Sequence, residues 1–115
     1  LKAIEILGSP EGLQFSHRRL TVSTCGLVHR LEKLGEKTKR FRLAVSLNAA
    51  DNATRDRLMP INRAYPIERL LKTCRVISLR HRERITFEYV LLKGVNDRPQ
   101  DAKALVKLFH GFKVK

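Results

Sequence analysis

The feature that most constrains this chain is a set of short segments that alternate apolar and polar residues, which is the two-residue period of a β-strand. The segments are Leu20–Ser23, Arg42–Leu47 and Arg84–Leu92. In the stretch RLAVSLNAA, which contains the second segment, one face is apolar and the other holds Ala44, Ser46 and Asn48. A strand buried on both faces normally reads as a continuous apolar run, so this small and polar face requires a partner of its own.

Helices are predicted around the strands from apolar residues at helical intervals and from their flanking residues. They are the end of a helix over 1–7, a helix from Gly26 to Gly35, a short helix over Thr54–Leu58 with Asp51 as N-cap and Pro60 after it, a helix that follows Pro66 and extends to Ile77, and a last helix around Ala104–Leu108. Residues 112–115 predict the start of one more strand. Strands that alternate with helices indicate a parallel sheet, either an open doubly wound sheet or an arc of a β/α barrel.

The polar faces of the predicted strands favour the barrel. They carry Thr21 and Ser23, then Ser46 and Asn48, then Thr86 and Glu88. If the apolar faces pack on the helices, the polar faces converge on one interior that a ligand can occupy. Ser23, Ser46 and Asn48 fall at the C-terminal ends of their strands, where β/α enzymes build their sites.

Each hydroxyl by itself is also typical of a strand residue that bonds to neighbouring backbone and has no role in a site. Glu88 is more informative, because a carboxylate inside a parallel sheet costs several kcal/mol unless it is paired or hydrogen-bonded. The sequence therefore predicts that Glu88 meets a cation or a ligand rich in hydrogen-bond donors.

The charge of the chain indicates the class of its partner. The sequence has 24 Lys and Arg against 11 Asp and Glu, a formal net charge of +13 in 115 residues, which is about the length of one domain. Nucleic acid fits this charge better than a membrane, because the sequence has no long apolar run or basic amphipathic helix. A basic protein without a polyanionic partner is the alternative.

The cysteines and the ends of the sequence indicate the compartment. Cys25 and Cys74 match no CxxC or zinc-ligand spacing, and the first residues, LKAIEILGSP, lack the features of a signal peptide. We therefore expect reduced thiols and a cytoplasmic location. The missing initiator Met and the β-like end FKVK predict a piece of a longer protein.

Four ordered blocks carry a resemblance to a known family. The blocks are RRLTVSTCG (Arg18–Gly26), RLAVSLNAADNATRDRLMPIN (Arg42–Asn62), YPIERLL (Tyr65–Leu71) and ITFEYVLLKGVND (Ile85–Asp97). Together they resemble the radical S-adenosylmethionine RNA methyltransferases of the RlmN type. The resemblance implies that residues 1–115 are a fragment of a partial, TIM-like β/α barrel domain. It also implies a 4Fe-4S cluster, S-adenosylmethionine, and methylation of carbon 2 of an adenine in ribosomal and transfer RNA. The residues that choose between carbon 2 and carbon 8, the atom that related antibiotic-resistance enzymes methylate, lie outside this sequence.

The resemblance also assigns cofactor-binding residues. It places Ser23, the first Ser of an STxG block, against S-adenosylmethionine together with Ser46, Leu47 and Asn48 at the end of the next strand, with Leu47 contributing mainly its backbone. Glu88 joins the set because it shares the polar face. The family commonly has His at the position of Asn48, and Asn keeps a donor and an acceptor without titrating near neutral pH.

Other parts of the enzyme that the resemblance implies are absent from the sequence. It contains no CxxxCxxC motif to hold the cluster, and Cys25 and Cys74 cannot replace that motif. No catalytic or metal-binding residue is therefore assigned, and the fragment alone is expected to be inactive. Arg55, Arg57 and Arg63, in the loop region after the second strand, are the predicted contacts to RNA. Unpaired strand edges predict that the isolated piece associates with itself.

Two other functions are consistent with the sequence. One is a non-catalytic basic α/β module that binds RNA through charge alone. The other is an ordinary β/α enzyme, such as an aldolase-like barrel with Glu88 as a base, although no Lys lies on the polar strand faces to form a Schiff base.

Overall fold

The strands of the computed structural model, which describes residues 20–37 and 41–115, form one parallel sheet. They are β1 (Thr21–Thr24), β2 (Arg42–Ser46) and β3 (Thr86–Glu88), in the order β1-β2-β3. The segment 112–115 continues the sheet beside β3, because a parallel bridge joins Ile85 to Val114 and the Lys115 N–H donates to the Ile85 carbonyl at 2.9 Å. The predicted parallel sheet is confirmed.

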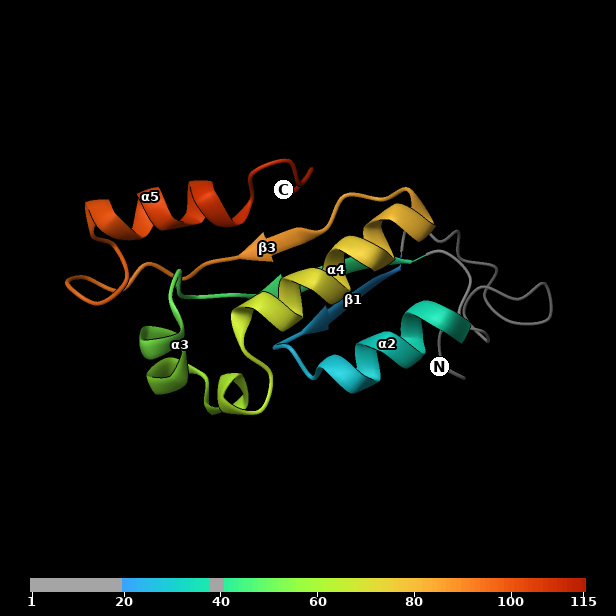
Figure 1. Ribbon diagram of the computed structural model, residues 1–115, viewed down its shortest axis with the longest axis horizontal. Helices are drawn as coiled ribbons and strands as arrows, with labels where there is room; N and C mark the ends of the chain where they lie inside the picture. The colour runs from blue at the N-terminus through green and yellow to red at the C-terminus, as the bar shows by residue number, and fades with distance from the viewer. Residues whose placement is uncertain (1–19, 38–40) are drawn as a thin grey trace.

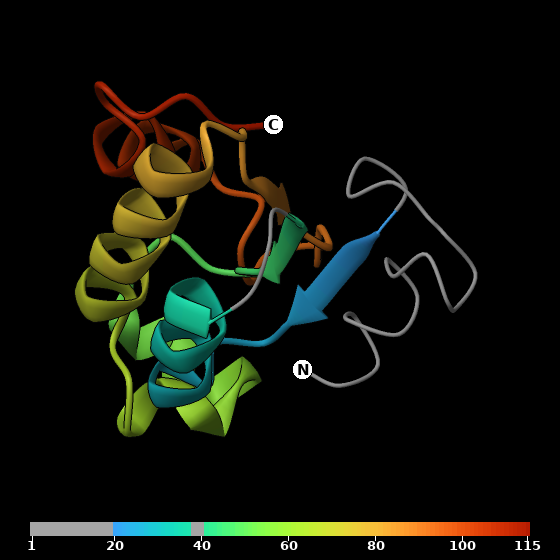
Figure 2. The same ribbon diagram turned by 90° about the vertical axis from the view of Figure 1, so that its right-hand side faces the viewer.

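Helices follow each of these strands. The described helices are α2 (Val28–Lys37), α3 (Asn52–Leu58), the 3₁₀ helix η2 (Pro60–Arg63), α4 (Ile67–His81) and α5 (Pro99–Leu108). Figures 1 and 2 show α2, α4 and α5 on one side of the sheet, and no described helix covers the other side. A doubly wound sheet has helices on both faces and a strand order that reverses. Sequential parallel strands with helices on one face instead form an arc of a β/α barrel.

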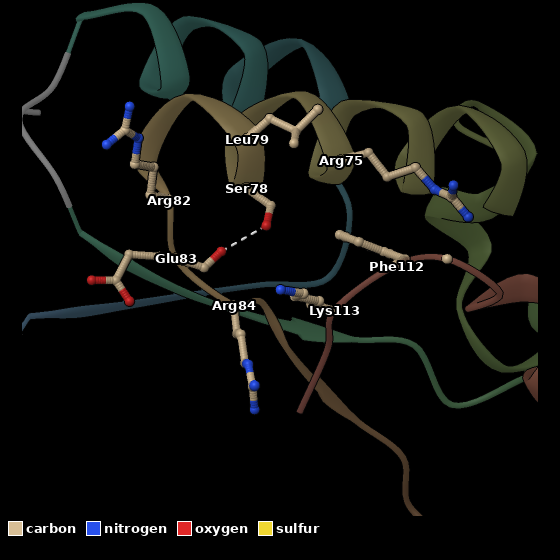
Figure 3. A pocket seen from close by; sticks show the side chains of 9 residues that line it. Arg75, Ser78, Leu79, Arg82, Glu83, Arg84, Phe112 and Lys113 are labelled. Atoms are coloured by element: carbon tan, nitrogen blue, oxygen red, sulfur yellow. Dashed lines mark hydrogen bonds between the residues drawn. The ribbon is translucent and has the colours of Figure 1, made fainter.

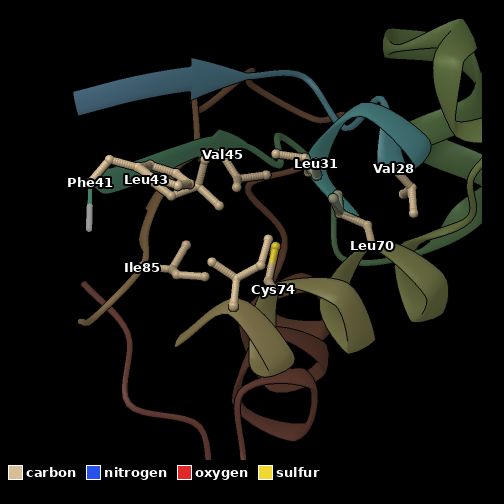
Figure 4. Packing of buried hydrophobic residues seen from close by; sticks show 9 residues of the cluster. Val28, Leu31, Phe41, Leu43, Val45, Leu70, Cys74 and Ile85 are labelled. Atoms are coloured by element: carbon tan, nitrogen blue, oxygen red, sulfur yellow. The ribbon is translucent and has the colours of Figure 1, made fainter. Parts of the chain in front are cut away.

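The core lies between the apolar strand face and the helices (Figure 4). Leu43 and Val45 of β2 pack with Leu31 of α2 and with Leu70 and Cys74 of α4, all of them buried. A second, smaller cluster joins the end of β2 to the start of α4, and side chains of α5 pack against it. The helices are therefore fixed to the sheet through its apolar face, and no helix of the described residues packs on the polar face.

Local signals placed two of the helices correctly. The Asp51 carboxylate accepts a hydrogen bond from the Thr54 N–H at 2.8 Å, which makes it the N-cap of α3 as predicted. Pro66 precedes α4, which continues to His81. The predicted end of α2 at Gly35 is wrong, because the helix continues to Lys37. A Cβ at Gly35 would lie 2.9 Å from Ile77 Cγ1, so this glycine allows the close approach of α2 and α4.

The third strand is shorter than the alternation over 84–92 predicts. A strand needs a neighbour that supplies ladder hydrogen bonds, and the last such bond to β2 runs from the Leu47 N–H to the Glu88 carbonyl at 2.9 Å. Beyond Glu88 the chain leaves the sheet and exposes the side chains of Val90 and Leu91. The helix predicted over 1–7 lies outside the described residues.

Candidate functional site at the polar face of the sheet

The face of the sheet that no described helix covers brings together the polar strand residues. The strand register places Ser23, Ala44 and Thr86 in one row across the sheet, and Ser46 beside Glu88 in the next row. The hydroxyl and carboxylate residues of these rows are exposed or half-buried. Three strands thus present one polar surface, and its C-terminal edge holds Ser46 and Glu88.

Ser46 and Glu88 form the best-defined pair on this surface. The Ser46 hydroxyl donates a hydrogen bond to the Glu88 carboxylate, with the oxygens 3.3 Å apart. Glu88 is exposed in the described part of the chain. Its carboxylate is therefore not desolvated there, in contrast to the burial that the sequence pattern suggests. The free oxygen of the carboxylate can accept a further hydrogen bond from a ligand.

Leu47 and Asn48 follow the last residue of β2, Ser46, but their side chains serve the packing of the chain and do not lie on the polar surface as Ser46 does. The Leu47 side chain is buried in the core, and its carbonyl accepts a hydrogen bond from Arg55 Nε at 3.0 Å. Asn48 has a left-handed backbone (φ 59°), and its Oδ1 accepts a hydrogen bond from the Val90 N–H at 2.9 Å. The Asn48 side chain therefore fixes the segment after β3, and Ser46 presents the hydroxyl of this stretch on the polar face.

Ser23 lies near the end of β1, just before a tight turn. The Gly26 N–H donates to the Thr24 hydroxyl at 3.1 Å, and Gly26 has a positive φ of 111°. A Cβ at Gly26 would lie 3.2 Å from Leu70 Cδ2 and 3.3 Å from Arg55 Nη2. Glycine is thus needed here both for the backbone conformation and for the close packing beneath the turn.

The prediction that Arg55 contacts RNA is wrong. Its side chain is 0 % exposed, so no phosphate can reach the guanidinium. Arg55 and Leu58, three residues apart, lie on the same side of α3, and this spacing is a weak local signal for an inward side chain that the prediction did not use. The side chains of Arg57 and Arg63 are exposed at the surface. Sequence reasoning also missed two buried amides, Asn62 and Asn96, for which no local pattern gives a signal.

The cysteine positions do not fit an iron–sulfur cluster. Cys25 is exposed and Cys74 is buried, where desolvation raises the pKa of the thiol to about 12. A cluster needs several thiolates on one loop, and these residues come from different elements. Among residues 20–37 and 41–115, no group of three or more His, Cys, Asp or Glu side chains is arranged to hold a metal ion.

A groove of about 570 Å³ lies away from the polar face, between α4 and residues 111–113 (Figure 3). Arg75, Arg82, Arg84 and Lys113 line it next to the exposed side chain of Leu79. Its arginines at 82 and 84 precede β3, at the opposite end of the strand from Glu88. The groove is therefore separate from the candidate site.

Comparisons with known proteins agree with this geometry. The chain is 54% identical to the dual-specificity RNA methyltransferase RlmN of Syntrophobacter fumaroxidans over 115 residues, which are 100% of this chain and 33% of that protein. It is 60% identical to RlmN of Desulfosudis oleivorans over 104 residues, which are 90% of this chain and 28% of that protein. The chain thus spans about a third of the length of these relatives. No model of a protein family matches the chain.

A solved structure shares the fold. The crystal structure of a radical SAM methyltransferase from Sphaerobacter thermophilus aligns with a TM-score of 0.90 and 42% sequence identity, over 96% of this chain and 33% of the other. The described part of the chain is therefore an arc of a radical SAM type β/α barrel. None of its described helices has the length and hydropathy that crossing a membrane requires.

Proposed function

We propose that this chain, which matches RlmN RNA methyltransferases along its length, is one arc of the barrel of such an enzyme and forms part of its S-adenosylmethionine site. The observation that carries the proposal is the polar surface of the sheet, where Ser46 and Glu88 lie beside each other at the C-terminal ends of β2 and β3, on the face opposite the described helices (Figure 2). The active sites of β/α barrels lie at this end of the strands.

The residues of the polar surface fit the cofactor. S-adenosylmethionine carries hydroxyl, amino and carboxylate groups, so it requires both donors and acceptors. The hydroxyls of Ser23 and Ser46 can donate and accept, the Glu88 carboxylate accepts, and the backbone of Leu47 and Asn48 completes the strand end. When bound, the cofactor supplies the methyl group and the radical for the reaction. This arc would, together with the rest of the barrel, enclose the cofactor and exclude water from it.

The iron–sulfur cluster that this class of enzyme uses does not fit the residues of this chain. Cys25 and Cys74 are its only cysteines, and the thiol of Cys74 is buried in the core. The ligands of the cluster would belong to another part of the enzyme. The 115 residues are thus a fragment of one barrel domain that we expect to be inactive alone, and its unpaired strand edges favour self-association when it is isolated.

The proposed substrate is an adenine of ribosomal RNA and transfer RNA, with carbon 2 as the methylated atom. The net charge of +13 supports an RNA partner, because phosphates are held by Lys and Arg. Arg57 of α3 and Arg63 of η2 are exposed in the connection that follows the C-terminal end of β2, the end of the strands where β/α barrels build their sites. They would hold phosphates around an unpaired or splayed-out adenine. Such an enzyme would act in the cytoplasm.

Product analysis tests this proposal. The intact protein, meaning the full-length enzyme that contains these 115 residues, has its cluster reconstituted under anoxic conditions. It is then incubated with S-adenosylmethionine, a reductant, and either ribosomal or transfer RNA. We expect 2-methyladenosine in the nuclease digest, and none when S-adenosylmethionine or the reductant is omitted. RNA binding without any methylated product would instead support a basic RNA-binding module. Formation of 8-methyladenosine would show that carbon 8, and not carbon 2, is the methylated atom.

A further inference from the structure

Arg55 is the most deeply buried charged residue near the candidate site. It lies in α3, and its side chain is 0 % exposed. Burial lowers the pKa of Arg55 from its ordinary value because desolvation disfavours the charged form. An arginine stays protonated even so, which means that a positive charge is held inside the protein.

The guanidinium bonds to backbone from two different strand ends. Nε donates to the Leu47 carbonyl at 3.0 Å, and Nη2 donates to the Ser46 carbonyl at 3.1 Å and to the Cys25 carbonyl at 2.8 Å. Ser46 ends β2, and Cys25 begins the turn after β1. Arg55 therefore joins the two segments that carry the proposed cofactor hydroxyls.

The remaining bond of Arg55 holds it in place from the other side. Nη1 donates to Asn62 Oδ1 at 3.0 Å, and Asn62 Nδ2 donates to Asp56 Oδ1 at 2.7 Å and to Asn52 Oδ1 at 3.1 Å. Within the described part of the chain, no carboxylate forms an ion pair with Arg55. Its charge is compensated by oriented carbonyl and amide oxygens and, through Asn62 and at longer range, by the Asp56 carboxylate, so its position depends on those groups being present.

This arrangement is costly if its only purpose is stability. A buried charge costs several kcal/mol, and an apolar side chain of similar volume is often equally stable in such a position. What a guanidinium adds is geometry, because its planar set of donors fixes several acceptors at once. The acceptors here are the strand ends immediately beside Ser23 and Ser46. Gly26 allows the turn to lie close to the guanidinium, because a Cβ added at this position would be only 3.3 Å from Arg55 Nη2.

We propose that Arg55 is a positioning residue of the S-adenosylmethionine site, which sets the distance between the turn after β1 and the end of β2 and so places the hydroxyls of Ser23 and Ser46. This inference rests on the proposed function. Arg55 does not contact the cofactor, since its guanidinium is enclosed by protein atoms. A lysine in its place keeps the charge but offers a single point of donors that cannot reach both strand ends.

Cofactor affinity, compared with stability, tests the inference. The dissociation constant of S-adenosylmethionine is measured by calorimetry on the intact protein for the wild type, Arg55→Lys and Arg55→Met, well below the melting temperature of each variant. A control variant, Ile77→Val, alters the core between α2 and α4, away from both strand ends. We expect both Arg55 variants to bind the cofactor about tenfold more weakly or worse, because small displacements of positioned groups have effects of this size. Ile77→Val should bind as the wild type does.

The outcomes separate the inference from the proposed function. If the wild type binds S-adenosylmethionine and Arg55→Lys binds equally well, the positioning role is refuted while the proposed function stands. If the wild type does not bind, the proposed function fails and the inference fails with it. Because Arg55→Met can fail to fold, Arg55→Lys provides the decisive comparison. For Arg55→Lys, a higher KM for S-adenosylmethionine with unchanged RNA affinity would support the positioning role. Equal decreases in the affinities for S-adenosylmethionine and for RNA would indicate general destabilisation and would contradict that role.

Discussion

The Asn96 amide ties the end of β2 to the segment after β3, because its Nδ2 donates to the Asn48 carbonyl at 2.7 Å and to the Val90 carbonyl at 2.8 Å. Its Oδ1 accepts a hydrogen bond from the Leu92 N–H, also at 2.7 Å. One buried side chain thus satisfies three backbone groups where the ladder between β2 and β3 has ended.

Replacing Asn96 by Ala should destabilise the protein. The change removes three partly buried hydrogen bonds of the Asn96 amide to backbone groups of Asn48, Val90 and Leu92, which costs about 2 kcal/mol in the free energy of unfolding. Urea denaturation of the intact protein measures the loss. Gln100→Ala, at an exposed position of α5, is the control and should change stability by less than about 0.5 kcal/mol. Equal effects of the two substitutions would refute the role of Asn96.

Gly35→Ala should also destabilise the protein, although alanine favours helices by about 1 kcal/mol over glycine. The new Cβ would lie 2.9 Å from Ile77 Cγ1, which is too close for an unshifted contact. We expect a net loss of about 1 to 2 kcal/mol, as for other overpacked cores. Ile77→Ala costs stability by itself, but in that background Gly35→Ala should cost much less, because the clashing atoms are gone, and a double-mutant cycle measures this coupling. A stabilising Gly35→Ala would contradict the close packing of α2 and α4.

The two thiols should differ in reactivity. The pKa of Cys74 is raised from 9.0 to about 12, so at pH 10 only about one per cent of this thiol is ionised in the folded protein. Iodoacetamide should modify the exposed Cys25 at pH 8 to 10 and leave Cys74 intact, while both react in denaturant. The protonated thiol also contributes stability that is fully present below pH 9 and is lost as the pH rises toward 12. Rapid modification of Cys74 in the folded protein would show that the core is not closed.

The strands, the parallel sheet and the Asp51 cap could be predicted from the sequence because each depends on a local pattern. The length of β3 could not be, since its alternation continues to Leu92 but its partner strand ends at Ser46. The burial of Arg55 depends on three carbonyls that only the folded chain brings together. In the sequence, Arg55 and Arg57 are two arginines of the same short helix, and charge alone does not tell which of them is buried. The polar face was predictable as a pattern, whereas the pairing of Ser46 with Glu88 required the register of the strands.

RNA affinity should depend on Arg57 and Arg63. Each of the substitutions Arg57→Gln and Arg63→Gln removes an exposed charge, so the slope of log affinity against log salt should fall by about one for each lost phosphate contact. Filter binding of transfer RNA at several salt concentrations measures this slope.

Arg84→Gln is the matched control for that measurement, because Arg84 is exposed before β3, at the opposite end of the sheet. It should leave the slope unchanged. If Arg84→Gln reduced the slope and the other two substitutions did not, RNA would bind the opposite face of the barrel.

The dissociation constant of S-adenosylmethionine for the intact protein, measured for Ser46→Ala and Glu88→Gln against the control Thr21→Ala, tests most directly whether the polar sheet surface binds the cofactor. Thr21 is the exposed first residue of β1, away from the C-terminal ends of the strands, and removing its hydroxyl should leave the cofactor affinity unchanged. Ser46→Ala removes a hydrogen-bonding hydroxyl, and Glu88→Gln removes the charge and replaces one acceptor oxygen by a donor; each change is worth about 1 kcal/mol, so we predict binding that is about fivefold to tenfold weaker. Affinities equal to that of the wild type for both Ser46→Ala and Glu88→Gln would contradict the account.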